Sequence, residues 1–511
     1  MDIFSGLFTI LFNFLPSLIL LIVVAGLVFL YLIDRHQVDH TIRRNYPVIG
    51  RFRYFLEDLG VFFRQYFFAQ DREEMPFNRA DRSWVYRAAK QESTMQAFGS
   101  TRAQREGDVL FANSVFPYSG EDTNESLVFG PYTENPYITD KFFHISGMSY
   151  GAISKPAIRA LVAGAKEAGI WINTGEGGAS REHLQGGADV VFQIGTAKYG
   201  VRNEDGTLSE EKLRAMADNS CVKMFEIKLS QGAKPGKGGI LPADKVTTEI
   251  AQQRGIPVGQ ASISPPGHAE VLNAEDLFQF IHHIRSIVKK PVGIKICVGN
   301  MEEFRALFQT LVSKAEAERS QHQDAQTAER AYLQVLADYA PDFITLDGGN
   351  GGTGAAPMSL IDAAGMNLPE SLPFVDNLLT ELNLRDRIKL VCSGKLITPV
   401  DVAWALCAGA DAVTTARGFM FSLGCIQALQ CHQNTCPTGI TTHNKKLQEG
   451  LDPHNKAVRV AAYANEMRKE VETIAHSCGV STPHQLSRKN ALIYVSNQHA
   501  RPMTDIYKSK S

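Results

Sequence analysis

The sequence predicts an α/β protein whose main part is a closed (β/α)8 TIM barrel. From residue 141 onward, short apolar runs alternate with helix-like segments, a pattern typical of parallel α/β folds. Eight such runs are present, and eight is the number of strands that closes a barrel of this kind. A doubly wound sheet is the alternative, but it needs a Gly-x-Gly-x-x-Gly turn after its first strand. The first turn reads Gly-Met-Ser-Tyr-Gly-Ala over 147–152 and lacks that fingerprint.

The expected strands and helices follow one another in regular order over residues 141–442. Strands are expected at 143–148, 170–174, 190–194, 222–229, 292–298, 343–346, 388–392 and 412–415. Helices are expected at 155–168, 209–219, 274–289, 302–338 and 399–409. The remaining segments, 34–140 and 443–511, are expected to be accessories of this barrel.

Composition excludes several other classes of protein. The chain has 511 residues, with 52 basic and 54 acidic side chains, and such a balance argues against a nucleic-acid partner. Eight cysteines in a chain of this length do not form a disulfide framework of the kind found in small secreted domains. A reducing compartment is therefore expected.

The N-terminal segment 7–33 predicts one transmembrane helix. It contains no charged residue and is long enough for a hydrocarbon layer of about 30 Å. A cleaved signal peptide is the rival, but its apolar region usually has about 7–15 residues and follows positive charge, whereas only Asp2 precedes this run. The arginines that follow are Arg35, Arg43, Arg44, Arg51 and Arg53. No lysine or arginine precedes the apolar run, and positive charge on one side of a span favours the cytoplasm for that side. The sequence therefore predicts a single-pass membrane protein with everything beyond residue 34 on the cytoplasmic side.

The segment 34–140 is expected to be a juxtamembrane and lead-in region. Residues 34–90 mix arginine with phenylalanine and tyrosine. They could lie against lipid headgroups, or they could form an amphipathic helix that packs on the barrel. Residues 91–140 carry turn residues and little periodicity, so an irregular lead-in is expected there.

Polar residues and glycines gather at the ends of the expected strands, where a (β/α)8 barrel carries its chemistry. Glycines there allow backbone N–H groups to approach a ligand closely. The turns after the last two strands are the usual phosphate site of this fold, and they hold 393–395 (Ser-Gly-Lys) and Arg417. A phosphate-bearing cofactor is therefore expected. Its candidate ligands are Met148, Ser149, Gly151, Asn173, Gln193, Lys228, Lys295, Asp347, Gly349, Gly351, Gly352, Ser393, Gly394, Lys395, Ala416 and Arg417.

Two lysines, Lys228 and Lys295, fall inside expected barrel strands, where a charge is costly unless it is compensated. A flavin would explain at least one of them, because reduced flavin carries negative charge. A salt bridge to a neighbour such as Glu226 is the structural alternative. The loop 231–242 is rich in glycine and carries Lys234, which suits a small anionic substrate above the cofactor.

Three cysteines near the C-terminal end, Cys425, Cys431 and Cys436, are spaced C-x5-C-x4-C and are followed by Pro and Gly. Thiolates at short, uneven spacings are typical ligands of iron–sulfur clusters. Three ligands suggest a [3Fe-4S] cluster, or a four-iron cluster with one other ligand. A zinc site and ordinary buried thiols remain alternatives.

Six strings together resemble one family, the flavin-binding synthase domain of glutamate synthase in its stand-alone form. They are MSYGAIS (148–154), NTGEGG (173–178), IKLSQGAKPGKGGILP (227–242), SPPGH (264–268), DGGNGGTGAAP (347–357) and GCIQALQCHQNTCPTGI (424–440). The resemblance covers about 140–445 in order and implies a (β/α)8 barrel that binds FMN beside a [3Fe-4S] cluster. The C-terminal iron–sulfur loop is its most specific part.

The resemblance also implies roles for particular residues. The three cysteines would hold the cluster, and Lys228 would lie beside the flavin. Gln231 and Lys234 would bind the carboxylates of 2-oxoglutarate, with Glu176 near the reacting carbon. Lys198 stands where the family commonly has arginine, so it would meet a carboxylate as a point charge rather than a bidentate fork.

The expected reaction is the reduction of an imine, formed from a 2-oxo acid and ammonia or an amine, to an amino acid. Electrons would come from an external donor, either ferredoxin or an NAD(P)H-dependent flavoprotein. The chain begins Met-Asp-Ile and has no cysteine before Cys221, so no glutaminase nucleophile is expected at its start and a separate glutaminase is a possible partner. The 297–301 segment reads Cys-Val-Gly-Asn-Met and lacks the Glu that the family carries in its glutaminase-linked element, so delivery of ammonia from a linked glutaminase is not expected. Residues 443–511 are expected to be helices and a polar tail. The alternative function is a membrane-tethered flavin and iron–sulfur electron-transfer protein without synthase activity.

Overall fold

The computed structural model describes residues 2–120, 125–496 and 498–508, with side chains from Phe14 onward. The chain divides into two compact units, 1–80 and 81–511. Within the predicted C-terminal extension, 497 and 509–511 lie outside the described residues, and so do 121–124 of the lead-in.

The first unit is made of consecutive helices. They are α1 Asp2–His36, α2 Thr41–Asn45, α3 Gly50–Phe63 and a π-helical turn, η1 Arg64–Phe68. The segment Phe14–His36 of α1 is 23 residues long, has a mean hydropathy of 2.7 and buries none of its most apolar window. The sequence-based prediction of a long apolar helix at this end is confirmed, and its length and composition suffice to cross a bilayer.

Eight parallel strands form a closed barrel in the second unit, as the alternating pattern predicts. The strands are β4 Phe143–Ile145, β5 Ile172–Asn173, β6 Val190–Ile194, β7 Val222–Lys228, β10 Val292–Ile296, β11 Phe343–Asp347, β12 Lys389–Ser393 and β13 Ala412–Thr415. They pair in chain order, and β13 closes the ring on β4 through the pair Val413–Phe143. Register places Lys228 directly opposite Lys295, and Asp347 opposite Ser393. Four functional candidates thus meet at one end of the barrel.

The helices around the barrel begin at the residues their capping chemistry favours. Ser154 accepts a hydrogen bond from Ala157 N at the start of α5 (Lys155–Ala168), and Gly169 ends that helix in the left-handed region, the usual C-terminal signal. The other long helices are α7 Glu210–Ala217, α9 Ala274–Val288, α10 Met301–Arg319, α11 Ala325–Tyr339, α13 Leu368–Glu381, α14 Pro399–Ala408 and α17 Pro453–Ser477. Further elements are α4 Arg79–Ala89, η2 Gly175–Gly177, α6 Arg181–Gln185, β8 Ile240–Leu241, η3 Ala243–Lys245, α8 Thr248–Arg254, β9 Ser262–Ile263, α12 Met358–Ile361, α15 Arg417–Leu423 and α16 Lys445–Gln448.

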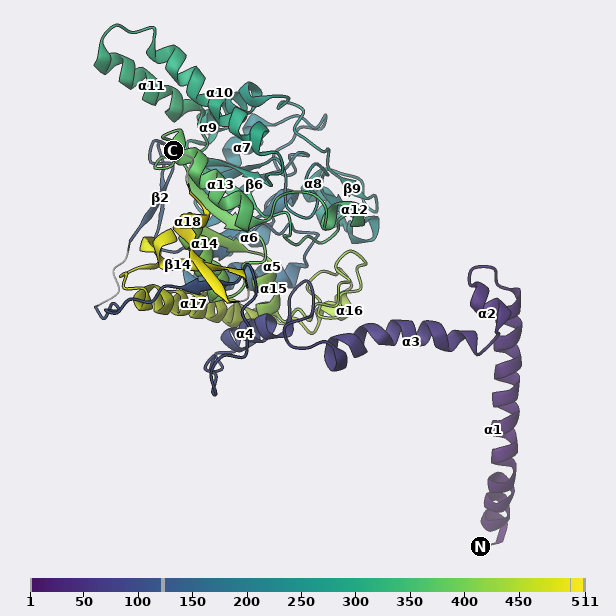
Figure 1. Ribbon diagram of the computed structural model, residues 1–511. Coiled ribbons are helices and arrows are strands. Elements are labelled where there is room, and N and C mark those ends of the chain that lie inside the picture. The colour runs from purple at the N-terminus through teal and green to yellow at the C-terminus, as the bar shows by residue number, and fades with distance from the viewer. Residues whose placement is uncertain (1, 121–124, 497, 509–511) are drawn as a thin grey trace. The chain divides into compact units, whose positions relative to one another are not determined.

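The single helix predicted over 302–338 is wrong in one respect, because the segment forms two helices, α10 and α11. Asp324 caps α11 by accepting a hydrogen bond from Thr327 N. The two helices pack on each other and project from the barrel as a hairpin (Figure 1). The turn between them contains neither glycine nor proline, so composition gave no sign of the break.

The irregular lead-in predicted for 91–140 is also corrected, since part of it forms a hairpin of β2 Leu127–Phe129 and β3 Tyr137–Thr139. Phe129 meets Trp171 and Phe343 edge to face, with ring centroids 5.5 and 5.8 Å apart. These rings belong to a buried cluster at the amino ends of the barrel strands: Leu127, Phe129, Tyr137, Trp171, Val191, Met224, Phe343, Val391 and Ala412. The hairpin therefore closes the barrel at the amino ends of its strands, and ligands must enter at the carboxyl ends.

The C-terminal extension is more than the helices and polar tail that were predicted. Helix α17 packs closely on α5, and a Cβ at Gly164 would lie 2.5 Å from Val460. Beyond it, η4 Pro483–Gln485 and η5 Arg488–Asn490 lead to β14 Ala491–Ser496, β15 His499–Pro502 and α18 Met503–Ile506. Strand β14 pairs antiparallel with β1 (Val109–Phe111) and with β15, so the extension is tied to the lead-in by a small sheet.

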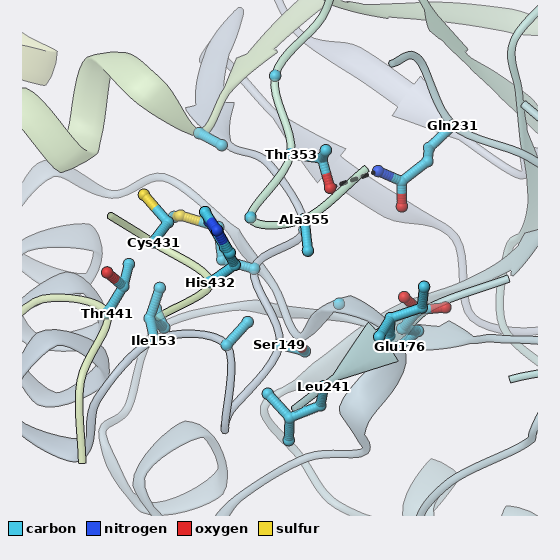
Figure 2. A pocket seen from close by; sticks show the side chains of 18 of the residues that line it. Ser149, Ile153, Glu176, Gln231, Leu241, Thr353, Ala355, Cys431, His432 and Thr441 are labelled. Atoms are coloured by element: carbon cyan, nitrogen blue, oxygen red, sulfur yellow. Dashed lines mark hydrogen bonds between the residues drawn. The ribbon is translucent and has the colours of Figure 1, made fainter. Parts of the chain in front are cut away.

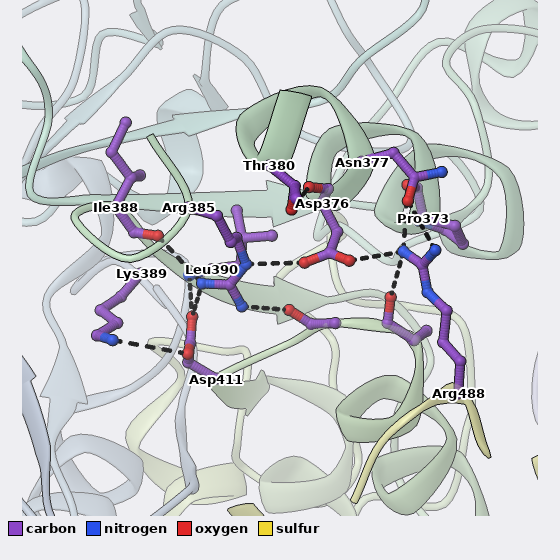
Figure 3. Close-up of polar contacts among 12 residues, drawn as sticks. Pro373, Asp376, Asn377, Thr380, Arg385, Ile388, Lys389, Leu390, Asp411 and Arg488 are labelled. Atoms are coloured by element: carbon purple, nitrogen blue, oxygen red, sulfur yellow. Dashed lines mark hydrogen bonds and ion pairs between the residues drawn. The ribbon is translucent and has the colours of Figure 1, made fainter. Parts of the chain in front are cut away.

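An ion-pair network joins this extension to the barrel helices (Figure 3). Asp376 on α13 accepts hydrogen bonds from Arg385 and Arg488, at 2.7 and 2.6 Å. Arg385 also pairs with Asp411 at 2.9 Å. The side chains of Arg488 and Asp376 are 17% and 18% exposed, so their charges are only weakly screened by solvent.

Replacing Arg488 by Ala is therefore expected to lower the free energy of unfolding by about 2–3 kcal/mol, because it leaves Asp376 with one of its two cations. Arg305→Ala is the matched control, since Arg305 of α10 pairs with Glu381 of α13, their side chains are 35% and 42% exposed, and exposed pairs contribute about 0–1 kcal/mol. Denaturant titration of the two variants measures the difference. Equal midpoints would show that the network does not hold the extension.

Candidate active site

Two adjoining cavities lie at the carboxyl ends of the barrel strands. The outer cavity encloses about 870 Å³ including space open to solvent, and the inner cavity about 550 Å³. Both are lined by Gly147, Gln193, Lys228, Gln231, Gly352, Ala416 and Arg417. These shared residues therefore form the boundary between the two adjoining cavities.

The outer cavity holds a group of polar side chains from three loops (Figure 2). Lys228 Nζ lies 3.2 Å from Glu176 Oε2 and donates to Gln231 Oε1 at 2.5 Å. Gln231 Nε2 in turn donates to Thr353 Oγ1 at 3.1 Å. Lys234 lines the same cavity and its side chain is buried. Four of the residues to which the family resemblance gave a role at the site are thus brought together: Glu176, Lys228, Gln231 and Lys234.

The protonation of this group follows from its charges. Burial alone would raise the pKa of Glu176, but the ammonium groups of Lys228 and Lys234 hold that pKa below its usual value. Glu176 is therefore ionised at neutral pH. Burial lowers the pKa of Lys234. One carboxylate thus faces two ammonium groups, and the excess positive charge suits an anionic ligand.

Glycine is required where the chain passes Glu176. A Cβ at Gly239 would lie 2.2 Å from Glu176 Oε1, and one at Gly195 would lie 2.7 Å from its Cβ. Both values are below any ordinary contact, and backbone on two sides therefore confines the carboxylate. The geometry of Glu176 is fixed by its neighbours rather than by solvent.

Two acids, the half-buried Asp347 and the buried Glu226, organise the strand ends beside the inner cavity. Lys295 Nζ lies 3.1 Å from Asp347 Oδ1. Burial disfavours the charged form of Lys295, but Asp347 and Glu226 hold its pKa above the usual value. Glu226 accepts hydrogen bonds from Asn173 Nδ2 and Gln193 Nε2, at 2.8 and 2.6 Å. The structural alternative named from the sequence was a salt bridge to a neighbour such as Glu226, whereas Lys295 pairs with Asp347 and Lys228 with Glu176.

The predicted phosphate ligands line the other side of the inner cavity. They are Gly351, Gly352, Ser393, Gly394, Lys395, Ala416 and Arg417. A Cβ at Gly352 would lie 2.8 Å from Arg417 Nε, so only glycine allows the guanidinium to lie against this loop. Arg417 Nη2 donates to Thr353 O, which links the cation to the loop that also holds Gln231.

Some predicted residues do not line either cavity. Lys198 is buried and pairs with Glu270 at 2.9 Å, so its charge is already matched away from the site. Asn173 lies beneath the cavity as a partner of Glu226. Gly349 holds the loop in place, since its carbonyl accepts from Ala233 N at 2.9 Å. Gly151 accepts from His443 Nε2 through its carbonyl at 2.8 Å, which is also a supporting contact.

Other lining residues were not predicted. Thr353 and His432 lie inside strings that were quoted for the family resemblance, beside residues that were named. Lys245 also lines the outer cavity, and it donates to Ala152 O and Cys431 O at 3.1 and 2.8 Å. It comes three residues after the glycine-rich loop 231–242, and a lone lysine there gave no signal.

The three cysteines of the predicted cluster lie on the loop after α15, beside two cations. Cys431 lines the outer cavity, and its Sγ lies 3.7 Å from Arg417 Nη1. Gln427 N donates to Cys425 Sγ at 3.5 Å, and Cys436 Sγ lies 3.3 Å from Thr438 Oγ1. Within residues 2–120, 125–496 and 498–508, no three His, Cys, Asp or Glu side chains converge as a metal site.

The surroundings of the thiols favour anionic sulfur at one position and oppose it at another. Burial raises the pKa of Cys425 to about 11. Burial also acts against ionisation of Cys436, but hydrogen bonds from Thr438 and Thr441 hold its pKa below the usual value. N–H and O–H donors and nearby cations are the environment that iron–sulfur ligands use. The donor chemistry of the loop therefore fits such a cluster.

Comparison with known proteins finds relatives that are named as glutamate synthases or as glutamate synthase-like. Residues 119–481 match a model described as the conserved region in glutamate synthase. The chain is 36% identical to the glutamate synthase large subunit-like protein YerD of Bacillus subtilis over 91% of both chains. It is 34% identical to the archaeal-type glutamate synthase (NADPH) of Thermotoga maritima, over 67% of this chain and 60% of that one. It thus spans about 60% of the length of the archaeal-type relatives.

Among solved structures, the flavin-binding domain of baker's yeast flavocytochrome b2 is similar to 84% of this chain. The alignment covers 81% of that domain, with 14% identity and a TM-score of 0.46. A lactate oxidase of Pediococcus acidilactici is similar over 81% of this chain and 86% of its own, with 12% identity and a TM-score of 0.46.

Proposed function

The chain belongs to the glutamate synthase family, and from that premise we propose that it is a membrane-anchored oxidoreductase acting on CH–NH2 donors. It joins a 2-oxo acid, 2-oxoglutarate or a close analogue, to ammonia or an amine and reduces the resulting imine to an amino acid. The observation that carries this proposal is the convergence of Glu176, Lys228, Gln231 and Lys234 in the outer cavity. The adjoining inner cavity is lined by glycines and cations of the kind that bind a phosphate.

The inner cavity fits FMN by its chemistry. Its walls combine glycine-rich backbone, which allows close approach, with the cations that a phosphate needs. The residues that would hold FMN are Ser146, Gly147, Gln193, Lys228, Lys295, Gly351, Gly352, Ser393, Gly394, Lys395, Ala416 and Arg417. FMN, when bound, would supply the hydride that reduces the imine.

The protein's own residues bind and orient the substrate. Lys234, buried and positively charged, pairs with one substrate carboxylate, and Gln231 donates an amide N–H to the other. Glu176 is ionised and therefore accepts or returns a proton at the amine nitrogen as the imine forms. Lys228 holds Glu176 in place through their 3.2 Å ion pair. Together these contacts restrict the substrate to one orientation at the mouth of the inner cavity.

Cys425, Cys431 and Cys436 would hold a [3Fe-4S] cluster, with Arg417 and Lys245 offsetting its negative charge. When bound, the cluster would pass electrons singly from an external donor. The donor is an electron-transfer protein such as a ferredoxin or an NAD(P)H-dependent flavoprotein, and a separate glutaminase is a natural source of ammonia. Support for the cluster comes from the spacing of the thiols and the donors that surround them.

The helix α1 would anchor the enzyme in a membrane with the barrel on the cytoplasmic side. Its apolar length and the arginines that follow it support this orientation.

The test of function uses the full-length protein, purified with its cofactors. After anaerobic photoreduction, addition of 2-oxoglutarate with ammonium should reoxidise the flavin and yield glutamate, which amino-acid analysis detects. An amine in place of ammonium tests for an N-substituted product. A flavin that stays reduced with every 2-oxo acid and amine, yet is reoxidised by an electron-transfer protein, would reject the synthase and support the alternative relay function.

A further inference from the structure

The helix α3 and the π-helical turn that continues it carry an exposed aromatic surface. Phe67 and Phe68 at its end are each 74% exposed. The other large apolar side chains exposed on these two elements are Phe52, Phe55, Leu56, Val61, Phe62, Phe63 and Tyr66. A surface this aromatic is unusual for a helix that faces water.

Most of these side chains share one helical face. Phe52, Phe55, Leu56, Leu59, Phe62 and Phe63 follow the i, i+3, i+4, i+7 spacing of a single stripe. On the opposite side are Arg53, Glu57 and Arg64, with Val61 among them. The helix α3 is therefore amphipathic, and its apolar face is exposed along with its polar face.

The corner between α1 and α3 is held by specific contacts. Asp34, only 1% exposed, pairs with Arg51 Nη2 at 2.7 Å and accepts a hydrogen bond from Val48 N at 2.9 Å. A Cβ at Gly50 would lie 2.8 Å from Ile42 O, so the chain can turn closely here only with glycine. The corner sets α3 crosswise to α1 within this unit (Figure 1). A helix crosswise to a membrane-spanning helix runs along the membrane surface.

Charge favours an anionic surface as the neighbour. Between residues 34 and 72 there are seven arginines, no lysine and five acidic residues. Asp34 is already paired with Arg51. Arginine beside aromatic side chains is the composition of helices that lie at the boundary between headgroups and acyl chains.

We propose that α3 and its π-helical extension lie in the headgroup region of the cytoplasmic leaflet, with the aromatic stripe toward the acyl chains and the arginines on lipid phosphates. This rests on the proposed anchoring by α1 and adds a second contact to it. One helix through the membrane leaves the chain free to swing about its end, whereas a second helix along the surface fixes the direction in which the chain leaves the membrane.

The test is tryptophan fluorescence of the full-length chain in vesicles of phosphatidylcholine and phosphatidylglycerol whose acyl chains carry bromine. Phe62→Trp places a probe on the aromatic stripe. Val61→Trp, one residue away and on the opposite side, is the matched control. The signal of Trp84, Trp171 and Trp404 is subtracted with the unsubstituted protein. Phe62→Trp is expected to lose about half or more of its added fluorescence, and Val61→Trp little.

Resistance of the chain to alkaline extraction from the vesicles reports on α1 independently. A chain that resists extraction but shows no quenching of Phe62→Trp would overturn the proposal and leave the anchor intact. If that probe were also protected from aqueous iodide, the aromatic stripe would lie against protein. Equal quenching at both positions would also overturn it, because the helix would have no preferred side. A chain that is extracted would remove the anchor and this inference together.

Discussion

We expect Lys234→Ala to abolish reoxidation of the photoreduced enzyme by 2-oxoglutarate and ammonium while the flavin spectrum stays unchanged. Lys234 is buried in the outer cavity and lies outside the set that lines the inner one. Removing one member of a buried pair of opposite charges costs about 2–5 kcal/mol, and each 1.4 kcal/mol is about tenfold in affinity. The loss should therefore be about 30-fold or more in the rate at low substrate concentration.

Lys237→Ala provides the control for this prediction. Lys237 is on the same glycine-rich loop, three residues further along, but its side chain is exposed to solvent. Its removal changes the net charge equally and should leave the rate within about twofold, because exposed charges are strongly screened. Equal rates for Lys234→Ala and the unsubstituted enzyme would exclude Lys234 from carboxylate binding. Equal losses in both variants would assign the effect to the charge of the loop as a whole.

The charges at the site also bear on the proposed substrate, which carries two carboxylates. Without ligand, Glu176 pairs with Lys228, whereas Lys234 is held in a buried position where its charged form is disfavoured. An incoming carboxylate relieves this cost by pairing with Lys234. Gln231 already bridges Lys228 and Thr353, so it can exchange a protein partner for a second carboxylate. Monocarboxylic 2-oxo acids lack one of these contacts.

The sequence was informative where function depends on the ends of regular strands. Alternation of apolar runs and helices predicts the barrel, and the barrel places the residues that follow each strand at one rim. Lys228, Lys295, Ser393 and Arg417 are far apart in the chain, yet that rule alone brings them together around the inner cavity. Their prediction needed no knowledge of side-chain contacts.

Contacts between side chains that are far apart in the chain could not be predicted from the sequence. Lys198 was assigned to a substrate carboxylate by its position in a motif, and no local pattern indicates the ion pair that it forms with Glu270, 72 residues later. The hairpin of β2 and β3 has only three residues in each strand, too few for a periodicity to be read. Strand β14 exists because it pairs with β1, more than 370 residues earlier, and no local pattern records that partner.

The second large effect is expected at the cysteine loop, where Cys431→Ser should remove the bound iron. A serine hydroxyl is a harder and far less acidic ligand than a thiol, so one of three protein ligands is lost. Cys431 is also the member that lines the outer cavity beside Arg417. The variant should lose the broad iron–sulfur absorbance and nearly all of its iron by elemental analysis, and keep its flavin. Reduction by an external donor should then fail, although photoreduction still works.

Cys221→Ser is the matched control because Cys221 is half-buried and lies on the turn before β7, far along the chain from the loop 424–442. It should retain iron and absorbance at the level of the unsubstituted protein. Iron that persists in Cys431→Ser would contradict the ligand assignment. Zinc in place of iron in the unsubstituted protein would contradict the redox role of the loop, since zinc carries no electrons. Electrons from the external donor would then have to reach the flavin by another route.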